Sequence, residues 1–180
     1  MSTYCQYVQG LPAENPHRFY HDNEYGFPIP DDNELFGRLL LEINQAGLNW
    51  TVILNKQDNF RAAYANFDLA AVASFTEADR ERLLNDAGII RNKLKVNAAI
   101  HNAQVILDLR QAYGSFQAWL DHHHPLPKSD WVRLFKKTFK FTGGEITGEF
   151  LMSTGYLPGA HEERCPVYQR VLETNPAWNR

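Results

Sequence analysis

Apolar residues recur along most of this chain at the three- and four-residue spacing of amphipathic helices. The clearest case is residues 32–46, where Leu35 and Leu39 belong to the apolar stripe, Asp32 is a candidate N-cap and Gly47 a stop. The same spacing, with its capping and breaking residues, predicts further helices at 49–64, 69–73, 77–85, 90–113, 116–122, 129–137 and 146–153.

Little of the chain is left for other structure. Residues 1–31 contain several glycines and prolines, and we expect them to be irregular. No alternating apolar run is long enough to require a sheet. Since no linker or repeat divides the sequence, the pattern predicts an all-α fold in which residues 1–180 form a single domain.

Composition agrees with a globular protein and narrows the choice of partner. The chain has 180 residues, of which 44% are hydrophobic and 22% charged, and its net charge is −3. A nucleic-acid partner would therefore require a local basic patch. With two cysteines, no leader-like start and no 18-residue apolar segment, we expect no membrane contact and a cytoplasmic protein with reduced thiols.

Candidate chemistry is concentrated between residues 20 and 50. Glu42 lies in the most apolar part of the predicted helix, Tyr20 and Tyr25 precede it, and Trp50 follows it by about two helical turns. An acid surrounded by aromatic rings suits a pocket for a flat, electron-poor ligand. The alternative is an ordinary core helix whose one glutamate points into solvent. A carboxylate is stable in the protein interior only with a partner, so an unpaired one is expected to be solvated.

Three segments carry a resemblance to a known family. They read YHDNEYG at 20–26, LLLEINQAGLNW at 39–50 and DAGIIRNKLKVNAAIHNA at 86–103, with a looser match at 134–155. This set resembles the DNA-3-methyladenine glycosylase I family, of the helix-hairpin-helix DNA glycosylase superfamily. The resemblance covers the chain to about residue 165, and the C-terminal third is divergent.

The resemblance implies an activity and a pocket. The family excises 3-methyladenine from alkylated double-stranded DNA by base flipping and releases the free base. Glu42 matches its catalytic pocket acid, Trp50 its stacking tryptophan and Tyr20 a pocket tyrosine. Tyr25 and Tyr7 replace two tryptophans usual in the family, which reduces the stacking area. No lysine is implied as a Schiff-base former, so we expect a monofunctional enzyme.

Cysteine and histidine residues occur near both ends of the chain. His161 and Cys165 have i,i+4 spacing, which would place them on one face of a helical turn. On spacing alone, the two cysteines could be unrelated thiols and His21 a core residue. The resemblance implies instead a structural Zn²⁺ held by Cys5, His21, His161 and Cys165, which would join the two ends. His17 is the competing N-terminal imidazole.

The segment FKFTGG at 139–144 lies between two predicted helices and resembles the hairpin of helix-hairpin-helix proteins. A glycine-containing turn lets backbone amides approach a phosphate, and the following helix directs its N-terminus at the same anion. The candidate DNA-binding residues are Lys136, Lys140, Thr142, Gly143 and Gly144. The alternative is a basic surface helix followed by an ordinary turn.

Two acids argue against a simple DNA-binding hairpin. Glu145 and Glu149 place negative charge where the family usually has uncharged residues. With Tyr25, they motivate a second hypothesis, in which the chain is a non-catalytic or lesion-shifted DNA-binding member of the same fold. A zinc-stabilised interaction module without a DNA role is a third. We expect a monomer in each case.

Overall fold

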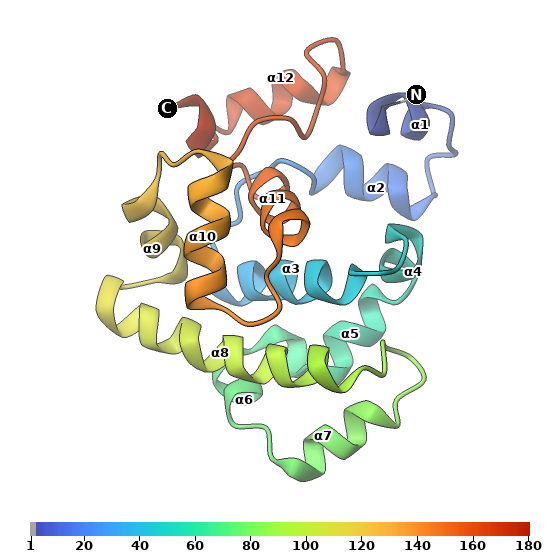
Figure 1. Cartoon of the computed structure of the whole chain (residues 1–180). Coiled ribbons are helices and arrows are strands. Elements are labelled where there is room, and N and C mark those ends of the chain that lie inside the picture. Colours follow the sequence, from blue (N-terminus) through green and yellow to red (C-terminus); the bar gives the residue numbers. More distant parts are fainter. Residues whose placement is uncertain (1–2) are drawn as a thin grey trace.

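The structure is a computed structural model that describes residues 3–180, and within this range it is helical throughout, as the sequence predicts (Figure 1). No described helix is both long and apolar enough to cross a membrane. The elements are α1 (Tyr4–Gln9), α2 (Pro16–Asn23), α3 (Asp32–Gln45), α4 (Trp50–Asn55), α5 (Gln57–Ala63), η1 (Ala65–Phe67), α6 (Leu69–Ala73), α7 (Glu77–Leu84), α8 (Lys93–Tyr113), α9 (Phe116–His123), α10 (Lys128–Thr138), α11 (Gly144–Ser153), α12 (Pro166–Glu173) and η2 (Ala177–Asn179).

Helix α3 runs through the middle of the molecule and packs against α4, α5, α8, α9 and α11 (Figure 1). Every residue from Leu35 to Asn44 is buried, so the helix contributes to the core on all sides. Its C-terminal end is fixed by Lys95 of α8, whose ammonium group donates to the carbonyls of Asn44 and Ala46 at 2.7 and 2.6 Å. A cation at this end satisfies carbonyls that the helix leaves free.

The predicted N-cap of this central helix was off by one residue. Asp31, not Asp32, caps α3 by accepting a hydrogen bond from the Glu34 amide at 3.0 Å. The Asp32 carboxylate instead accepts from the amides of Phe116 and Gln117, at the start of α9. Two adjacent aspartates thus begin two different helices, and only the tertiary structure distinguishes them.

The expectation that residues 1–31 are irregular was wrong for Tyr4–Gln9 and Pro16–Asn23, which are helices; residues 24–31 are irregular, and residues 1–2 lie outside the described residues. Helix α1 begins with a capping box in which Thr3 and Gln6 exchange hydrogen bonds. Helix α2 is capped by the Asn15 side chain and has Pro16 at its first position. Proline disrupts the interior of a helix because it has no amide hydrogen to donate. It is tolerated in the first turn, where amides have no acceptor within the helix. The prolines therefore mark helix starts as well as turns.

Proline at the first position also begins α12, at Pro166, which we did not predict. Its N-cap is Cys165, so His161 and Cys165 lie in a turn before the helix, not on one helical face. The predicted helix at 49–64 is divided at Lys56 into α4 and α5. Leu94, in the first turn of α8, is 67% exposed.

Candidate functional site

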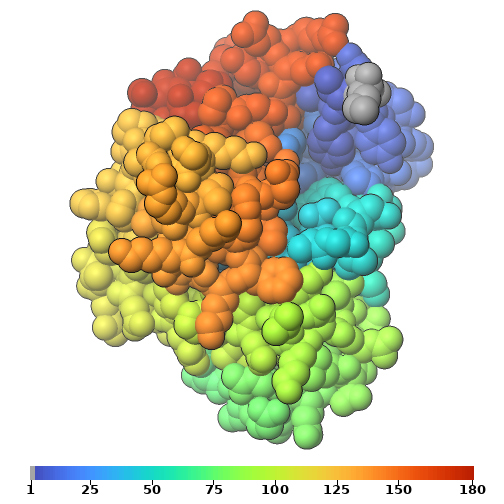
Figure 2. All heavy atoms as spheres, viewed as in Figure 1, coloured from blue at the N-terminus to red at the C-terminus, as the bar shows by residue number. Residues whose placement is uncertain are grey.

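A cavity of about 740 Å³ lies between α2, α3, α4 and the start of α11. On the face in Figure 2, orange spheres from the hairpin region meet the blue and cyan spheres of residues near α2 and α4. The volume is in the range typical of small-molecule sites. Its lining includes all four pocket residues expected from the sequence, Tyr20, Tyr25, Glu42 and Trp50, together with Tyr4 and Glu149.

Aromatic rings form one wall of this cavity. The Tyr20 ring lies 5.2 Å from that of Trp50 and 5.5 Å from that of Tyr25, centroid to centroid. Gly26 directs the chain after Tyr25, with a φ of +87°, and a Cβ on it would lie 2.9 Å from that of Ala160. Glycine is needed here both for the left-handed backbone and for the close approach.

The acid of the cavity has no hydrogen-bond partner among the residues that the structure describes. Glu42 is 4% exposed, and no hydrogen bond to its carboxylate is found among residues 3–180. Arg38, one turn earlier, bonds instead to Glu24 at 3.3 Å and to the Ser153 carbonyl. Burial raises the pKa of Glu42 to about 8, Arg38 opposes this rise and Glu149 adds to it. The alternative of a solvated core-helix glutamate is therefore wrong.

One residue of the cavity wall carries a buried hydrogen-bond donor without a partner among residues 3–180. The indole Nε1 of Trp50 is buried without a partner in the described part of the chain. Burial raises the pKa of the Tyr20 and Tyr25 hydroxyls above the usual value, so both remain protonated donors. An unpaired buried polar group costs stability, but the Trp50 Nε1 atom has too little accessible surface to bond to a ligand in the cavity, so the tyrosine hydroxyls are the donors that the cavity offers.

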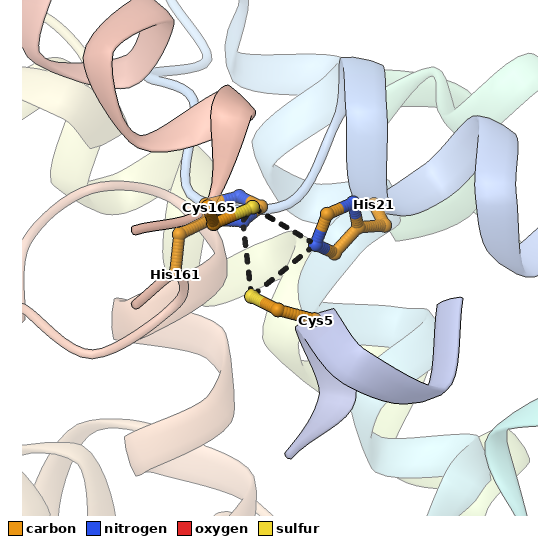
Figure 3. A group of neighbouring side chains, drawn as sticks. All are labelled: Cys5, His21, His161 and Cys165. Carbon is orange, nitrogen blue, oxygen red and sulfur yellow. Dashed lines mark hydrogen bonds between the residues drawn. The ribbon is translucent and has the colours of Figure 1, made fainter. Parts of the chain in front are cut away.

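The cysteines and histidines from the two ends of the chain come together, as Figure 3 shows. The ligand atoms of Cys5, His21, His161 and Cys165 lie within 4.8 Å of one another. His21 Nε2 is 3.4 and 3.7 Å from the two sulfurs, and His161 Nδ1 is 3.8 and 3.7 Å from them. Both thiols are buried and free.

These distances fit a tetrahedral zinc site. Ligand atoms placed about 2.0–2.3 Å from Zn²⁺ at tetrahedral angles are about 3.3–3.8 Å apart. The tautomers fit as well, because His21 Nδ1 donates to the Asp22 carboxylate and His161 Nε2 to the Tyr25 carbonyl, each at 2.7 Å. The nitrogens that face the sulfurs therefore carry lone pairs. The chemistry of the donor set thus suits a bound zinc ion.

His17 is not part of this group of ligands. Its ring bonds to the Tyr4 hydroxyl at 3.0 Å and to the Thr51 hydroxyl at 2.8 Å. It connects α1 and α2 to α4 beside the cavity. Of the two N-terminal imidazoles, the structure brings His21 to the cysteines.

The predicted hairpin joins α10 and α11 next to the cavity. Gly143 is the N-cap of α11 without a side-chain cap, so the first amides of the helix, at residues 144–146, have no partner within the described chain. A Cβ at Gly143 or Gly144 would meet nothing within 4 Å. Lys136 and Lys140 are exposed. The hairpin thus presents open amides and cations at one helix N-terminus.

Two hydrogen-bonded side chains fix the shape of the hairpin. Asn102 of α8 both donates to the Lys140 carbonyl and accepts from its amide, at 3.0 and 2.8 Å. The Thr142 residue is buried and its hydroxyl donates to the Phe135 carbonyl at 3.0 Å, so its side chain is held inside the hairpin. The left-handed residue of the turn is Phe141, with a φ of +62°.

Replacing both Lys136 and Lys140 with alanine is expected to weaken DNA binding equally for all sequences. Each lost phosphate contact should reduce the slope of log K against log salt by about 0.9, or about 2 for the pair. Equilibrium binding measured at several salt concentrations checks this. The double Lys→Arg variant, which keeps the charge, should keep the slope, and an unchanged slope in the alanine variant would place the DNA elsewhere.

Two residues of the site were missed from the sequence or given another meaning. Tyr4 fell in the segment expected to be irregular. Glu149 was interpreted as a charge facing DNA, although it also lies one turn after Glu145, on the face that lines the cavity.

Comparisons with known proteins agree with this geometry. The family model for methyladenine glycosylase matches residues 12–133. The chain is 37% identical over 168 residues to DNA-3-methyladenine glycosylase 1 of Escherichia coli, covering 83% of this chain and 89% of that protein. It is 29% identical over 185 residues to DNA-3-methyladenine glycosylase of Haemophilus influenzae, covering 92% and 98%.

Solved structures give the same result. A variant of 3-methyladenine DNA glycosylase I, crystallised in complex with 3-methyladenine, matches with a TM-score of 0.80 and 31% identity, covering 91% of this chain and 96% of that one. The 3-methyladenine DNA glycosylase I of Staphylococcus aureus matches with a TM-score of 0.77 and 32% identity, covering 87% and 93%. The chain therefore belongs to the methyladenine glycosylase family.

Proposed function

We propose that this protein is a monofunctional base-excision-repair glycosylase that hydrolyses the N-glycosidic bond of 3-methyladenine in alkylated DNA, acting as a single domain and a monomer. The observation that carries the proposal is the Glu42 carboxyl, which is buried at the wall of a ring-lined cavity and has no hydrogen-bond partner among residues 3–180. Relatives across most of the chain's length carry this activity in their names.

The chemistry follows from the charge of the lesion. Methylation at N3 makes the adenine cationic in DNA, so its glycosidic bond is already weak, and water is the final nucleophile. The enzyme must flip the nucleotide, bind the cationic base and stabilise positive charge that develops on the sugar. Trp50 offers a ring face to the cation, and Glu42 accepts hydrogen bonds from the amino edge of the base.

Protonation of Glu42 is coupled to this binding. With a pKa of about 8, the carboxyl is mostly neutral at pH 7 while the pocket lacks a cation. A cationic base beside it lowers the pKa again, because opposite charges at short distance favour the ionised form. Binding of the lesion therefore releases a proton, and the ion pair forms in a dry site where it is strong.

Cys5, His21, His161 and Cys165 are proposed to hold a structural Zn²⁺. Four protein ligands leave no position for water, so the ion supplies cross-linking of the two chain ends and no step of hydrolysis. The site also supports the pocket, since the Tyr25 carbonyl accepts from His161 while the Tyr25 ring lines the cavity.

DNA is proposed to reach the pocket along the hairpin, where the main-chain amides of Thr142, Gly143 and Gly144 approach a phosphate and Lys136 and Lys140 add positive charge. This places the phosphate contact next to the cavity, because Gly143 and Gly144 also line it.

Release of free base separates this function from its alternatives. Methylated and unmethylated duplex DNA are incubated with the protein, and released bases are separated from the DNA and identified. The proposal expects 3-methyladenine from the methylated duplex only. DNA binding without release would favour the non-catalytic member, and absence of both would favour an interaction module without a DNA role.

A further inference from the structure

A second carboxyl group, that of Glu149, lines the same cavity as Glu42. It lies on α11, half-buried, and accepts a hydrogen bond from the Tyr25 hydroxyl at 3.3 Å. Nothing in the function proposed above uses it. On the helix that follows the hairpin, a glutamate would be expected to repel DNA phosphate. The contact that Glu149 makes is instead with the hydroxyl group of Tyr25, which lines the cavity.

The charged groups around Glu149 do not fully compensate a negative charge on its carboxylate. Burial raises its pKa, and Glu145 adds to the rise; the Tyr25 hydrogen bond and the charge of Lys128 oppose it. Lys128 reaches α11 over Gly148, where a Cβ would lie 2.7 Å from the lysine Cε. Glu149 also raises the pKa of Glu42, so each carboxylate makes ionisation of the other more costly. A cation bound in the cavity would relieve both.

We propose that Glu149, held by the Tyr25 hydroxyl, is a specificity-determining residue that binds the cationic base as a second carboxylate of the pocket. The inference rests on the function proposed above and deepens it. Two acids on different helices, α3 and α11, let the pocket hold a positively charged purine from two sides. The pocket therefore discriminates against neutral purines more strongly than one acid would allow.

The hydroxyl group of Tyr25 accounts for the position of the Glu149 carboxylate in the cavity. A tyrosine hydroxyl protonated at all physiological pH values donates to a carboxylate and fixes its direction. The tyrosine stands where the family usually has tryptophan, and Glu149 where it usually has an uncharged residue. The two departures from the family pattern are thus in direct contact with each other.

Binding of 3,9-dimethyladeninium, a permanently cationic analogue of the methylated base in DNA, and of neutral 9-methyladenine, measured by calorimetry, tests the inference without any DNA phosphate. The variants are Glu149→Gln, Tyr25→Phe, the double variant, and Glu81→Gln as the control, an exposed glutamate on α7 that does not line the cavity. Glutamine keeps the shape and one acceptor but removes the charge. Thermal unfolding verifies that each variant is folded, and single-turnover excision is measured in parallel.

Glu149→Gln should weaken binding of the cationic analogue about tenfold, leave binding of 9-methyladenine unchanged and slow excision, since a charge-assisted hydrogen bond is lost. Glu81→Gln should bind the cationic analogue within about twofold of wild type. Tyr25→Phe should cost little more once Glu149 is glutamine, because the two act as one unit. If wild type excises 3-methyladenine and Glu149→Gln matches it in binding and selectivity, the inference is overturned and the function stands. If wild type neither binds the cationic analogue nor releases 3-methyladenine, both fail.

Discussion

Replacing Glu42 with glutamine should slow excision of 3-methyladenine by about ten- to a hundredfold and, at alkaline pH, make the folded protein more stable. Glutamine keeps the size and one acceptor oxygen of the side chain. The lost contribution to catalysis is a charge-assisted hydrogen bond in a dry site, of about 1.5–3 kcal/mol.

The gain in stability follows from the pKa. Glu42 has a folded-state pKa of about 8 against 4.5 for an ordinary glutamate, so the folded protein holds the proton more tightly than the unfolded chain. The contribution of the protonated Glu42 carboxyl to folding stability is fully present below pH 4.5 and is lost as the pH rises through 8. Burying the ionised carboxylate then costs about 3–5 kcal/mol, a penalty that glutamine does not carry.

Chemical denaturation at about pH 5 and about pH 9, below and above the folded-state pKa of Glu42, measures this change. The free energy of unfolding of Glu42→Gln is expected to exceed that of wild type by more at the higher pH. Glu34→Gln is the matched control. It lies on the same helix but is exposed and paired with Arg61 at 2.8 Å, so it should leave the excision rate unchanged. Equal excision rates in wild type and folded Glu42→Gln would remove Glu42 from the mechanism.

Replacing Cys165 with serine should abolish zinc binding and destabilise the protein by about 3–5 kcal/mol, which lowers the melting temperature by about 10 °C. A serine hydroxyl is a poor zinc ligand, and it leaves a buried polar group among the remaining ligands. Excision should fall as well, because the Tyr25 carbonyl is bonded to His161 of the same site.

Metal analysis and thermal unfolding, on protein purified without chelator, measure both effects. Val167→Thr is the control, because this buried residue packs beside Cys5 and Cys165 without being a candidate ligand. It should lower the melting temperature while the zinc content stays at one ion per chain. Wild-type protein without zinc, or a Cys165→Ser variant of unchanged stability, would contradict the proposed zinc site.

Much of the fold could be predicted because the helices carry their own signals. Asn49 caps α4, Ser115 caps α9 and Gly114 ends α8, each as the sequence indicates. The errors came from positions where local chemistry is ambiguous. Either of two adjacent aspartates can cap α3, and a proline such as Pro16 can begin a helix or break one.

Three residues of the pocket could be predicted from the sequence, whereas its second acid could not. Tyr20, Glu42 and Trp50 belong to one stretch of sequence, and their resemblance to a family pattern gave their roles before the fold was known. Glu149 lies more than a hundred positions after Tyr25, so only the tertiary structure shows that the two side chains are bonded. The orphaned state of the Glu42 carboxyl is likewise a property of packing that no spacing reveals.

The most direct test of the central claim is single-turnover release of 3-methyladenine from methylated duplex DNA by the zinc-loaded wild-type protein. Enzyme is in excess over lesions, so the rate reports the chemistry and not product release. We predict that 3-methyladenine appears in one exponential phase and that unmethylated DNA yields no free base. A folded, zinc-loaded protein that binds the methylated duplex and releases no 3-methyladenine would contradict the claim.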